Sequence, residues 1–404
     1  MKVLMIAPEP FLETRGTPIS VYQRLRALSS LGYSVDLLTY HVGQDVNIPG
    51  TTIHRIPNIP FIKEVKIGPS WPKLILDVLI FFKAIIMLAT KRYDVIHAHE
   101  EAVFFSTILA AVFHTRHLYD MHSSLPQQLK NFNSWNHWLF IKLFELLERW
   151  AIQTCDGVIT ISSDLRDYVS KINPAAKQVM IENLAIQTTV SNTHQPSVKM
   201  LRERLGLDSK LPIVYTGNFE CYQGVELLIE SAEIVKRQHP KVLFIFVGGK
   251  PPQVEYWQNE MRRKHLEDCT LFVGSVPLEE VSTYLEMAEI LVSPRLEGTS
   301  VPLKIYSYLL SGKPTVATNL LTHTQVLDEE IAMLAAPTKE AFAEGIASLI
   351  RDPDLRRQLG LKAQKFANEK NAPASYLTKL EQIYQVLKPS EYPSKQPVSS
   401  VESR

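Results

Sequence analysis

The fold is constrained most by an alternation of short apolar runs with segments of helical spacing along the whole chain. In the first half, apolar runs at 3–7, 94–97 and 117–121 are separated by segments such as 74–89, in which apolar residues recur at helical spacing. The second half repeats the alternation, for example with an apolar run at 242–247. Strands that alternate with helices form right-handed β-α-β units around a parallel sheet. The sequence therefore predicts an α/β fold.

Polar and irregular sequence between about residues 187 and 199 interrupts this alternation once. Because 404 residues exceed what one hydrophobic core usually organises, we expect two α/β domains of similar size. Such a pair places a ligand cleft at the carboxyl ends of its parallel strands. The expected parts are a first domain over 1–190, a linker over 191–210, a second domain over 211–370, a helix over 371–388 that could pack back on the first domain, and a disordered tail over 389–404.

The composition is that of a globular protein, with 45% hydrophobic and 21% charged residues and a net charge of +1. A charge so close to zero gives no reason to expect a nucleic acid partner. The three cysteines, Cys155, Cys221 and Cys269, are far apart and cannot all pair. This usage suits a reducing compartment and argues against a structural zinc site.

Four segments bear on the location of the protein. The apolar start at 3–7 is short and ends at a proline, so it reads as a first strand and not as a signal peptide. Segment 74–89 contains two charged residues and is shorter than a usual membrane span, so we expect a buried helix and a cytoplasmic protein. Basic and aromatic residues at 61–66 and 71–73 would allow a peripheral contact with the inner face of a membrane.

The aromatic residues at 131–138 precede a strongly amphipathic helical pattern. They could anchor the chain to a membrane surface or bind a lipid acceptor. A helix that is simply half-buried in the domain is the more common explanation of such a pattern.

A loop of small polar residues follows the apolar run at 290–292 and precedes a helical segment at 303–310. It contains Glu297, a glycine and two hydroxyl residues. Backbone N–H groups at a helix start favour anionic oxygens, and a carboxylate can accept hydrogen bonds from two sugar hydroxyls. The loop thus favours a sugar or phosphate site, while an ordinary strand-to-helix crossover stays open.

The loop after the first strand has similar features. Gly16 would let the backbone approach a ligand closely, and Thr17 and Pro18 suit the start of a helix. A phosphate or sugar site and a purely structural helix start are both compatible with this pattern.

Three histidines follow predicted strands. His97 and His99 lie two residues apart on an extended segment and would point the same way, but their spacing reveals no third metal ligand, and we expect no metal site. His122 ends the next strand, where an imidazole could hydrogen-bond to a sugar hydroxyl or to a developing negative charge. A structural histidine is the alternative for His122.

In their order and spacing, these elements resemble the family-4 glycosyltransferases of the GT-B fold. The resemblance covers about residues 2–385 and is strong only when its fragments are taken together. The fragments are Gly16, 31–35, 93–99, 120–122, 214–217, 223–224, 246–249, 297–304 and 312–317.

The resemblance implies two Rossmann-like domains that face each other across a cleft, with the acceptor bound mainly by the first domain and the donor mainly by the second. It implies a metal-independent, retaining transfer of a sugar from a nucleotide-sugar donor to a lipid, polysaccharide or small-molecule acceptor, with no cofactor. By position, His122 would contact the donor sugar near the reacting centre, Glu297 would hold its hydroxyls, and Gly16 would lie beside the donor phosphates. Backbone amides at 299–303 would help to stabilise the departing diphosphate.

The sequence departs from the family pattern at three donor contacts. Asn218 and Gln223 stand where the family usually has a basic pair on the phosphates, and Ser307 stands where it usually has a second glutamate on the ribose. Since an unpaired diphosphate in a cleft is costly, other cations are needed. The donor site that we predict comprises Arg15, Gly16, Gly217, Asn218, Gln223, Arg295, Gly298, Thr299, Ser300, Lys304 and Ser307, in which Arg15, Arg295 and Lys304 replace the basic pair.

Two other functions remain as alternatives. A GT-B epimerase would act on a nucleotide sugar without an acceptor, but it needs acid–base pairs that are not evident beside His122. A non-catalytic binding or scaffold protein would explain the changes at Asn218, Gln223 and Ser307.

Overall fold

The computed structural model describes residues 1–13, 16–65, 70–131, 138–185, 197–207, 209–298, 300–370 and 372–388. Several predictions above concern residues outside this part of the chain: Arg15, Lys66, residues 132–137, the linker residues 191–196, Thr299 and the tail 389–404.

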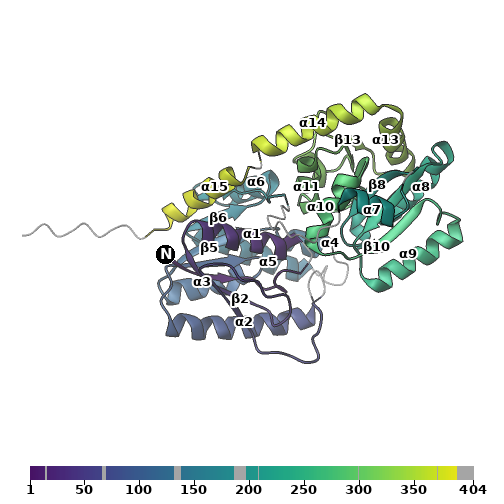
Figure 1. The fold of residues 1–404 in the computed structure, drawn as a ribbon. Helices are drawn as coiled ribbons and strands as arrows, with labels where there is room; N and C mark the ends of the chain where they lie inside the picture. Colours follow the sequence, from purple (N-terminus) through teal and green to yellow (C-terminus); the bar gives the residue numbers. More distant parts are fainter. Residues whose placement is uncertain are drawn as a thin grey trace, which may run out of the picture.

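The first domain is built on a seven-stranded parallel sheet with the order β3-β2-β1-β4-β5-β6-β7 (Figure 1). Its strands are β1 (Lys2–Ile6), β2 (Ser34–Thr39), β3 (Thr51–Arg55), β4 (Val95–His99), β5 (Arg116–Met121), β6 (Gly157–Thr160) and β7 (Gln178–Met180). Every residue of β4 is buried, because helices cover both faces of the sheet. Parallel strands of this kind need nearly continuous apolar runs, which is why the central strands were visible in the sequence.

Helices cover the two faces of this sheet unequally. The helix α1 (Gly16–Ser30) packs on one face, and α2 (Trp71–Thr90), α3 (Ala102–Val112), α5 (Trp138–Thr154) and α6 (Ser163–Ile172) pack on the other. The short helix α4 (Leu125–Asn131) contacts α5. Among the helices described, none combines the length and the apolar content that crossing a bilayer requires.

The second domain repeats the architecture on a six-stranded parallel sheet with the order β10-β9-β8-β11-β12-β13 (Figure 1). Its strands are β8 (Leu211–Thr216), β9 (Val242–Val247), β10 (Thr270–Gly274), β11 (Ile290–Ser293), β12 (Thr315–Thr318) and β13 (Met333–Ala335). Its helices are α7 (Val198–Arg204), α8 (Val225–Gln238), α9 (Pro251–Lys264), α10 (Leu278–Met287), α11 (Leu303–Ser311), α12 (Leu321–Thr324), α13 (Lys339–Arg351) and α14 (Pro353–Lys370). The helix α7 lies inside the range expected to be a linker and packs on α10.

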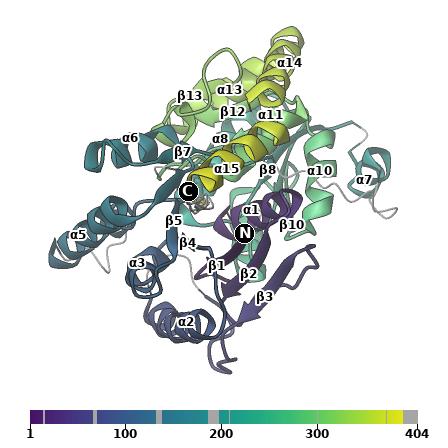
Figure 2. The same cartoon turned by 90° about the vertical axis from the view of Figure 1, so that its left-hand side faces the viewer.

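The last helix, α15 (Pro373–Val386), leaves the second domain and packs on the first, against α1, β6 and β7 (Figure 2). It contributes Leu380, Ile383 and Tyr384 to the core on the α1 face of the sheet. The first domain is thus completed by residues from the far end of the chain.

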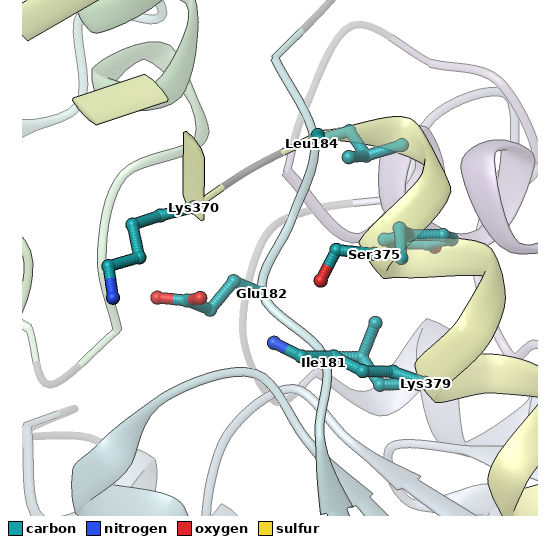
Figure 3. A pocket seen from close by; sticks show the side chains of 8 residues that line it. Ile181, Glu182, Leu184, Lys370, Ser375 and Lys379 are labelled. Atoms are coloured by element: carbon teal, nitrogen blue, oxygen red, sulfur yellow. The ribbon is translucent and has the colours of Figure 1, made fainter. Parts of the chain in front are cut away.

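A small pocket lies where the chain passes between the domains, lined by residues after β7 and by the start of α15 (Figure 3). Figure 3 shows the Glu182 carboxylate pointing toward the ammonium group of Lys370, with Lys379 nearby. Burial raises the pKa of Glu182, and the positive charges of Lys379 and Lys370 oppose that shift.

Candidate active site

The loop between β11 and α11 holds Arg295 in a fixed position. The Nε of Arg295 donates to the carbonyl oxygen of Glu297 at 2.7 Å, and its own carbonyl accepts from the hydroxyl of Thr318 at 2.5 Å. Gly298 adopts a left-handed φ of 115°, and a Cβ there would lie 2.2 Å from Nη2 of Arg295. A glycine is therefore required for the guanidinium to lie against this turn.

Lys304, in the first turn of α11, carries a buried ammonium group. Its Nζ lies 3.9 Å from the centroid of the Tyr215 ring and has no hydrogen-bond partner among the described residues. Burial holds the pKa of Lys304 well below its usual value, and the nearby positive charge of Arg295 is a second, smaller cause of this lowering. The site therefore contains two cations side by side without a described acidic partner for Lys304.

The loop after β8 packs against the Arg295 loop. The amide N–H of Leu296 donates to the carbonyl of Tyr222 at 2.9 Å, and the Arg295 guanidinium lies 5.1 Å from the Tyr222 ring centroid. Gly217 has a φ of 137°, and a Cβ there would lie 3.3 Å from Nζ of Lys304. Residues from the ends of β8 and β11 thus converge on the same small volume.

Asn218 and Gln223 lie in this loop but make different contacts. The carbonyl of Asn218 accepts from the Tyr215 hydroxyl at 2.6 Å, and its side-chain oxygen accepts from the amide of Glu220 at 3.3 Å. Gln223 is buried, and its side-chain oxygen has no partner among the described residues. Asn218 therefore shapes the loop, whereas Gln223 retains an unused acceptor.

The other residues predicted to bind the donor lie farther apart than Arg295, Lys304 and Gly217 do. Ser307 is buried within α11, Glu297 is exposed at the tip of the loop, and Gly16 begins α1 with no atom within 4 Å of a Cβ built on it. Ser300 reaches across to the first domain, where its hydroxyl donates to the carbonyl oxygen of His122 at 3.1 Å. Arg15 and Thr299 lie outside the described residues.

On the first domain, a buried ion pair organises the histidines. The Nε of Arg24 donates to Asp120 at 2.8 Å, and both side chains are almost fully buried. Burial alone would raise the pKa of Asp120, but Arg24 and the neighbouring histidines hold it well below its usual value. In the sequence, Asp120 was named only as part of the fragment 120–122 and Arg24 was not named, although an arginine on the apolar face of a predicted helix was a signal for a buried pair.

The histidines extend from this ion pair toward the second domain. His97 Nε2 lies 3.1 Å from Asp120, and its Nδ1 lies 2.8 Å from the hydroxyl of Tyr384 on α15. His99 Nδ1 lies 3.0 Å from Nε2 of His122. Burial lowers the pKa of His122 to about 4, against the opposing charge of Asp120, so His122 is neutral near pH 7.

His97, His99 and Asp120 are close enough together to share a metal ion, and Asp120 is the third ligand that spacing did not reveal. The Arg24 guanidinium already occupies the carboxylate, however, and both nitrogens of His97 have protein partners. A cation would have to displace these contacts and approach Arg24, so the cluster fits a hydrogen-bonded network better than a metal site.

Two acids near His122, the half-buried Glu100 and the buried Glu148, were also missed in the sequence. Ser123 donates to Glu100 at 2.8 Å, and Ser124 donates to Glu148 at 2.9 Å. Burial raises the pKa of Glu100 to about 7 and that of Glu148 to about 8. Glu100 also has a left-handed φ of 50°, which is strained for a residue with a side chain. Glu148 lies in α5 at helical spacing from the buried Ile141, Ala151 and Ile152. Because α5 also carries apolar residues on its exposed side, the sequence alone did not single out the buried face.

The fold is similar to those of solved structures of low sequence identity. Sucrose-phosphate synthase from Thermosynechococcus elongatus aligns with a TM-score of 0.79 and 20% identity, over 96% of this chain and 98% of that one. Anabaena HepE, solved in complex with UDP-glucose, aligns with a TM-score of 0.72 and 16% identity, over 96% and 99%. The predicted arrangement of two Rossmann-like domains is therefore confirmed, and it defines the GT-B class.

Two family models match the chain, one for each domain. The model described as Glycosyltransferase Family 4 matches residues 14–184, and the model described as Glycosyl transferases group 1 matches residues 199–366. This chain belongs to the family-4 glycosyltransferases, as its motifs predicted.

A curated relative agrees with this assignment. Alpha-maltose-1-phosphate synthase of Mycolicibacterium smegmatis is 26% identical over 260 residues, which are 59% of this chain and 65% of the relative. The match thus spans just under two thirds of the length of that relative.

Proposed function

We propose that this chain transfers a sugar from a nucleotide-sugar donor to an acceptor hydroxyl, with retention of configuration and without a metal ion or other cofactor. The bond between the anomeric carbon and the phosphate oxygen breaks, and a bond to the acceptor oxygen forms on the same face. The acceptor proton leaves with the nucleoside diphosphate. Residues 1–190 would bind mainly the acceptor, and residues 211–370 mainly the donor.

The observation that carries this proposal is the buried ammonium of Lys304 beside Arg295. An ammonium that has left water without gaining a hydrogen bond is costly, and its cost falls when an anion binds. A diphosphate supplies two negative charges and several acceptor oxygens at the scale of this volume. Arg295 and Lys304 would thus supply the positive charge that Asn218 and Gln223 lack.

We assign His122 and Glu297 to the donor sugar. A neutral His122 can hydrogen-bond to a sugar hydroxyl without adding a positive charge near the anomeric carbon. Its carbonyl is already linked to Ser300 of the donor domain, which keeps the two halves of the site in contact. Glu297 is exposed on the donor loop and would accept hydrogen bonds from sugar hydroxyls. HepE, which has the same fold, has been solved with UDP-glucose, and this supports a nucleotide sugar as the donor.

The acceptor that we propose is a lipid, a polysaccharide or a small molecule. The cytoplasm is the location that we propose, with contact at the inner face of a membrane. The described cysteines are unpaired, which suits a reducing compartment.

A thermal-shift panel of uridine, guanosine and adenosine diphosphate sugars tests the proposal. One of them should raise the melting temperature in proportion to its occupancy, and it should be turned over by the wild-type enzyme but not by His122→Ala. The His122→Ala protein must still show the nucleotide shift, which separates loss of chemistry from loss of folding. No shift with any nucleotide would favour a non-catalytic protein, and turnover to an isomer without an acceptor would favour an epimerase.

A further inference from the structure

One side of the first domain exposes an unusual amount of apolar surface. Of the 21 large hydrophobic side chains that are exposed in the described part of the chain, 14 lie on α2, α3 and α5. These helices are neighbours, since α3 contacts both of the others, and Figure 2 shows them following one another along one side of the sheet. The exposed groups therefore form one continuous surface, which we call the α2–α3–α5 face.

The helix α2 is apolar on both of its sides. Leu76, Ile80 and Ala84 are buried against the sheet, whereas Val78, Phe82 and Ile86 point outward and are exposed. An ordinary surface helix presents polar residues to water, and a helix that is apolar all round is normally covered. The outer side of α2 is therefore built for an apolar environment.

The helix α5 adds positive charge to the same face. Its exposed side carries Leu143, Leu146 and Trp150 together with Lys142 and Arg149. No acidic side chain on the described parts of the three helices is exposed, because Asp77 and Glu145 are half-buried and Glu148 is buried. The α2–α3–α5 face thus combines apolar and aromatic groups with cations only.

We propose that the α2–α3–α5 face binds the surface of an anionic lipid bilayer. Apolar side chains with tryptophans would enter the boundary between headgroups and acyl chains, and Lys142 and Arg149 would meet acidic headgroups. A second copy of the chain fits this face less well. A two-fold interface would set the same cations against each other with no exposed acid on these helices to pair with them.

This surface overlaps only in part with the segments that the sequence suggested, since Trp71 and Trp138 lie on it and residues 61–65 do not. Lys73 pairs with Glu101, and Glu64 pairs with Lys250 of the second domain at 2.8 Å, so these charges serve contacts within the protein. The proposed membrane contact therefore keeps Trp71 and Trp138 and otherwise lies on the outer sides of the three helices.

The position of the face connects it to the candidate site. The helices α2, α3 and α5 each lie in a connection between two parallel strands, so each begins on the side of the carboxyl ends of the strands, the side that also carries His122. The pairing of Lys73 with Glu101 places the start of α2 beside the end of β4. A bilayer on this face would therefore hold a lipid-anchored acceptor near the opening of the site.

Vesicle flotation of the full chain tests this inference independently of the transfer reaction. Wild-type protein should float with phosphatidylcholine vesicles that contain about 30% phosphatidylglycerol and only weakly with pure phosphatidylcholine. The double variant Phe82→Ser/Ile86→Ser should bind the anionic vesicles at least about tenfold more weakly, because two apolar side chains are lost from the boundary. The variant Lys142→Gln/Arg149→Gln should bind roughly 30-fold more weakly to anionic vesicles, with its residual binding insensitive to salt.

The matched control is Leu361→Ser on α14. The Leu361 side chain is 62% exposed, like that of Ile86, but it lies on the second domain. It should float like the wild type. Light scattering without lipid gives the mass of each protein. The wild type could prove to be a dimer that does not bind vesicles and that Phe82→Ser/Ile86→Ser converts to a monomer. That result would overturn the inference and show that the face binds a second copy of the chain. Equal binding of the wild type and the double variant would overturn it as well.

Discussion

At the scale of single residues, Lys304 has a buried amino group that the described residues leave without a hydrogen-bond partner. Its ammonium lies over the Tyr215 ring, close to Arg295, with no hydrogen-bond partner among the described residues. The protein accepts this cost in its free state, which is typical of binding sites, where stability is given up for function.

Lys304→Met should therefore have opposite effects on stability and binding. We expect the free protein to become more stable by about 1 kcal/mol or more, because an unpaired buried charge is removed. The affinity for the nucleotide that stabilises the wild type should fall roughly tenfold or more. Urea unfolding and calorimetric titration measure the two effects, with the exposed Lys362→Met as the control. Unchanged nucleotide affinity would contradict the role given to Lys304.

Glu148 gives a residue-scale prediction for pH. Its folded-state pKa is raised by burial to about 8, from 4.5. A raised pKa means that its contribution to stability is fully present below the unfolded pKa and is lost as pH rises toward 8. Glu148→Gln should remove this loss. The free energy of unfolding of the variant should therefore rise relative to that of the wild type by up to about 1.4 kcal/mol per pH unit across that window. Unfolding curves of the wild type and Glu148→Gln from pH 5 to about 8.5 would show this, and parallel curves for the two proteins would refute it.

At the scale of elements, the central strands and the edge strand β10 were readable from the sequence, and the other three edge strands were not. The strand β11 (Ile290–Ser293) was visible as the apolar run at 290–292, because burial on both faces requires a continuous apolar run. The strands β3, β7 and β13 were missed. All three lie at a sheet edge and are only partly buried. The strands β3 and β7 carry polar residues, and β7 and β13 are only three residues long, so none of them shows a clear pattern in the sequence.

The loop from β11 to α11 is the element on which donor binding should depend most. Gly298→Ala would place a Cβ 2.2 Å from Nη2 of Arg295 at a left-handed φ, so it should displace the guanidinium and weaken nucleotide binding roughly tenfold. Gly206→Ala is a matched control, since it has a left-handed φ of 64° but open space around the new Cβ. It should cost stability through its backbone without changing nucleotide affinity. Titration of both variants with the same nucleotide decides whether the turn positions Arg295.

At the scale of the whole molecule, the chain returns to its starting domain. The helix α15 follows the second domain in sequence, yet it buries Tyr376, Leu380 and Tyr384 in the first. Tyr384 also meets His97, so the end of the chain supports the histidines of the candidate site. This arrangement couples the stability of the first domain to residues that follow the whole second domain in the chain.

Ending the chain after Lys370 should therefore destabilise the first domain selectively. Several buried apolar side chains are lost, each contributing about 2 kcal/mol, so the melting transition of the first domain should fall well below that of the second. Ending the chain after Lys388 instead should leave both transitions unchanged, because α15 is retained. Calorimetry of the two shortened chains checks this, and equal transitions in both would show that α15 does not complete the first domain.

The sequence by itself determined the α/β class, the two-domain organisation, the family and the loops that meet at the site. It could do so because these depend on local signals: burial period, glycines in special conformations and motifs of fixed spacing. Only the tertiary structure decided that Asp120 joins Arg24 to His97, that Glu148 is buried, that Lys304 has no described partner and that α15 closes the first domain. Each of these is a contact between residues distant in the chain or a property of burial, and both are fixed by packing, which no local pattern encodes.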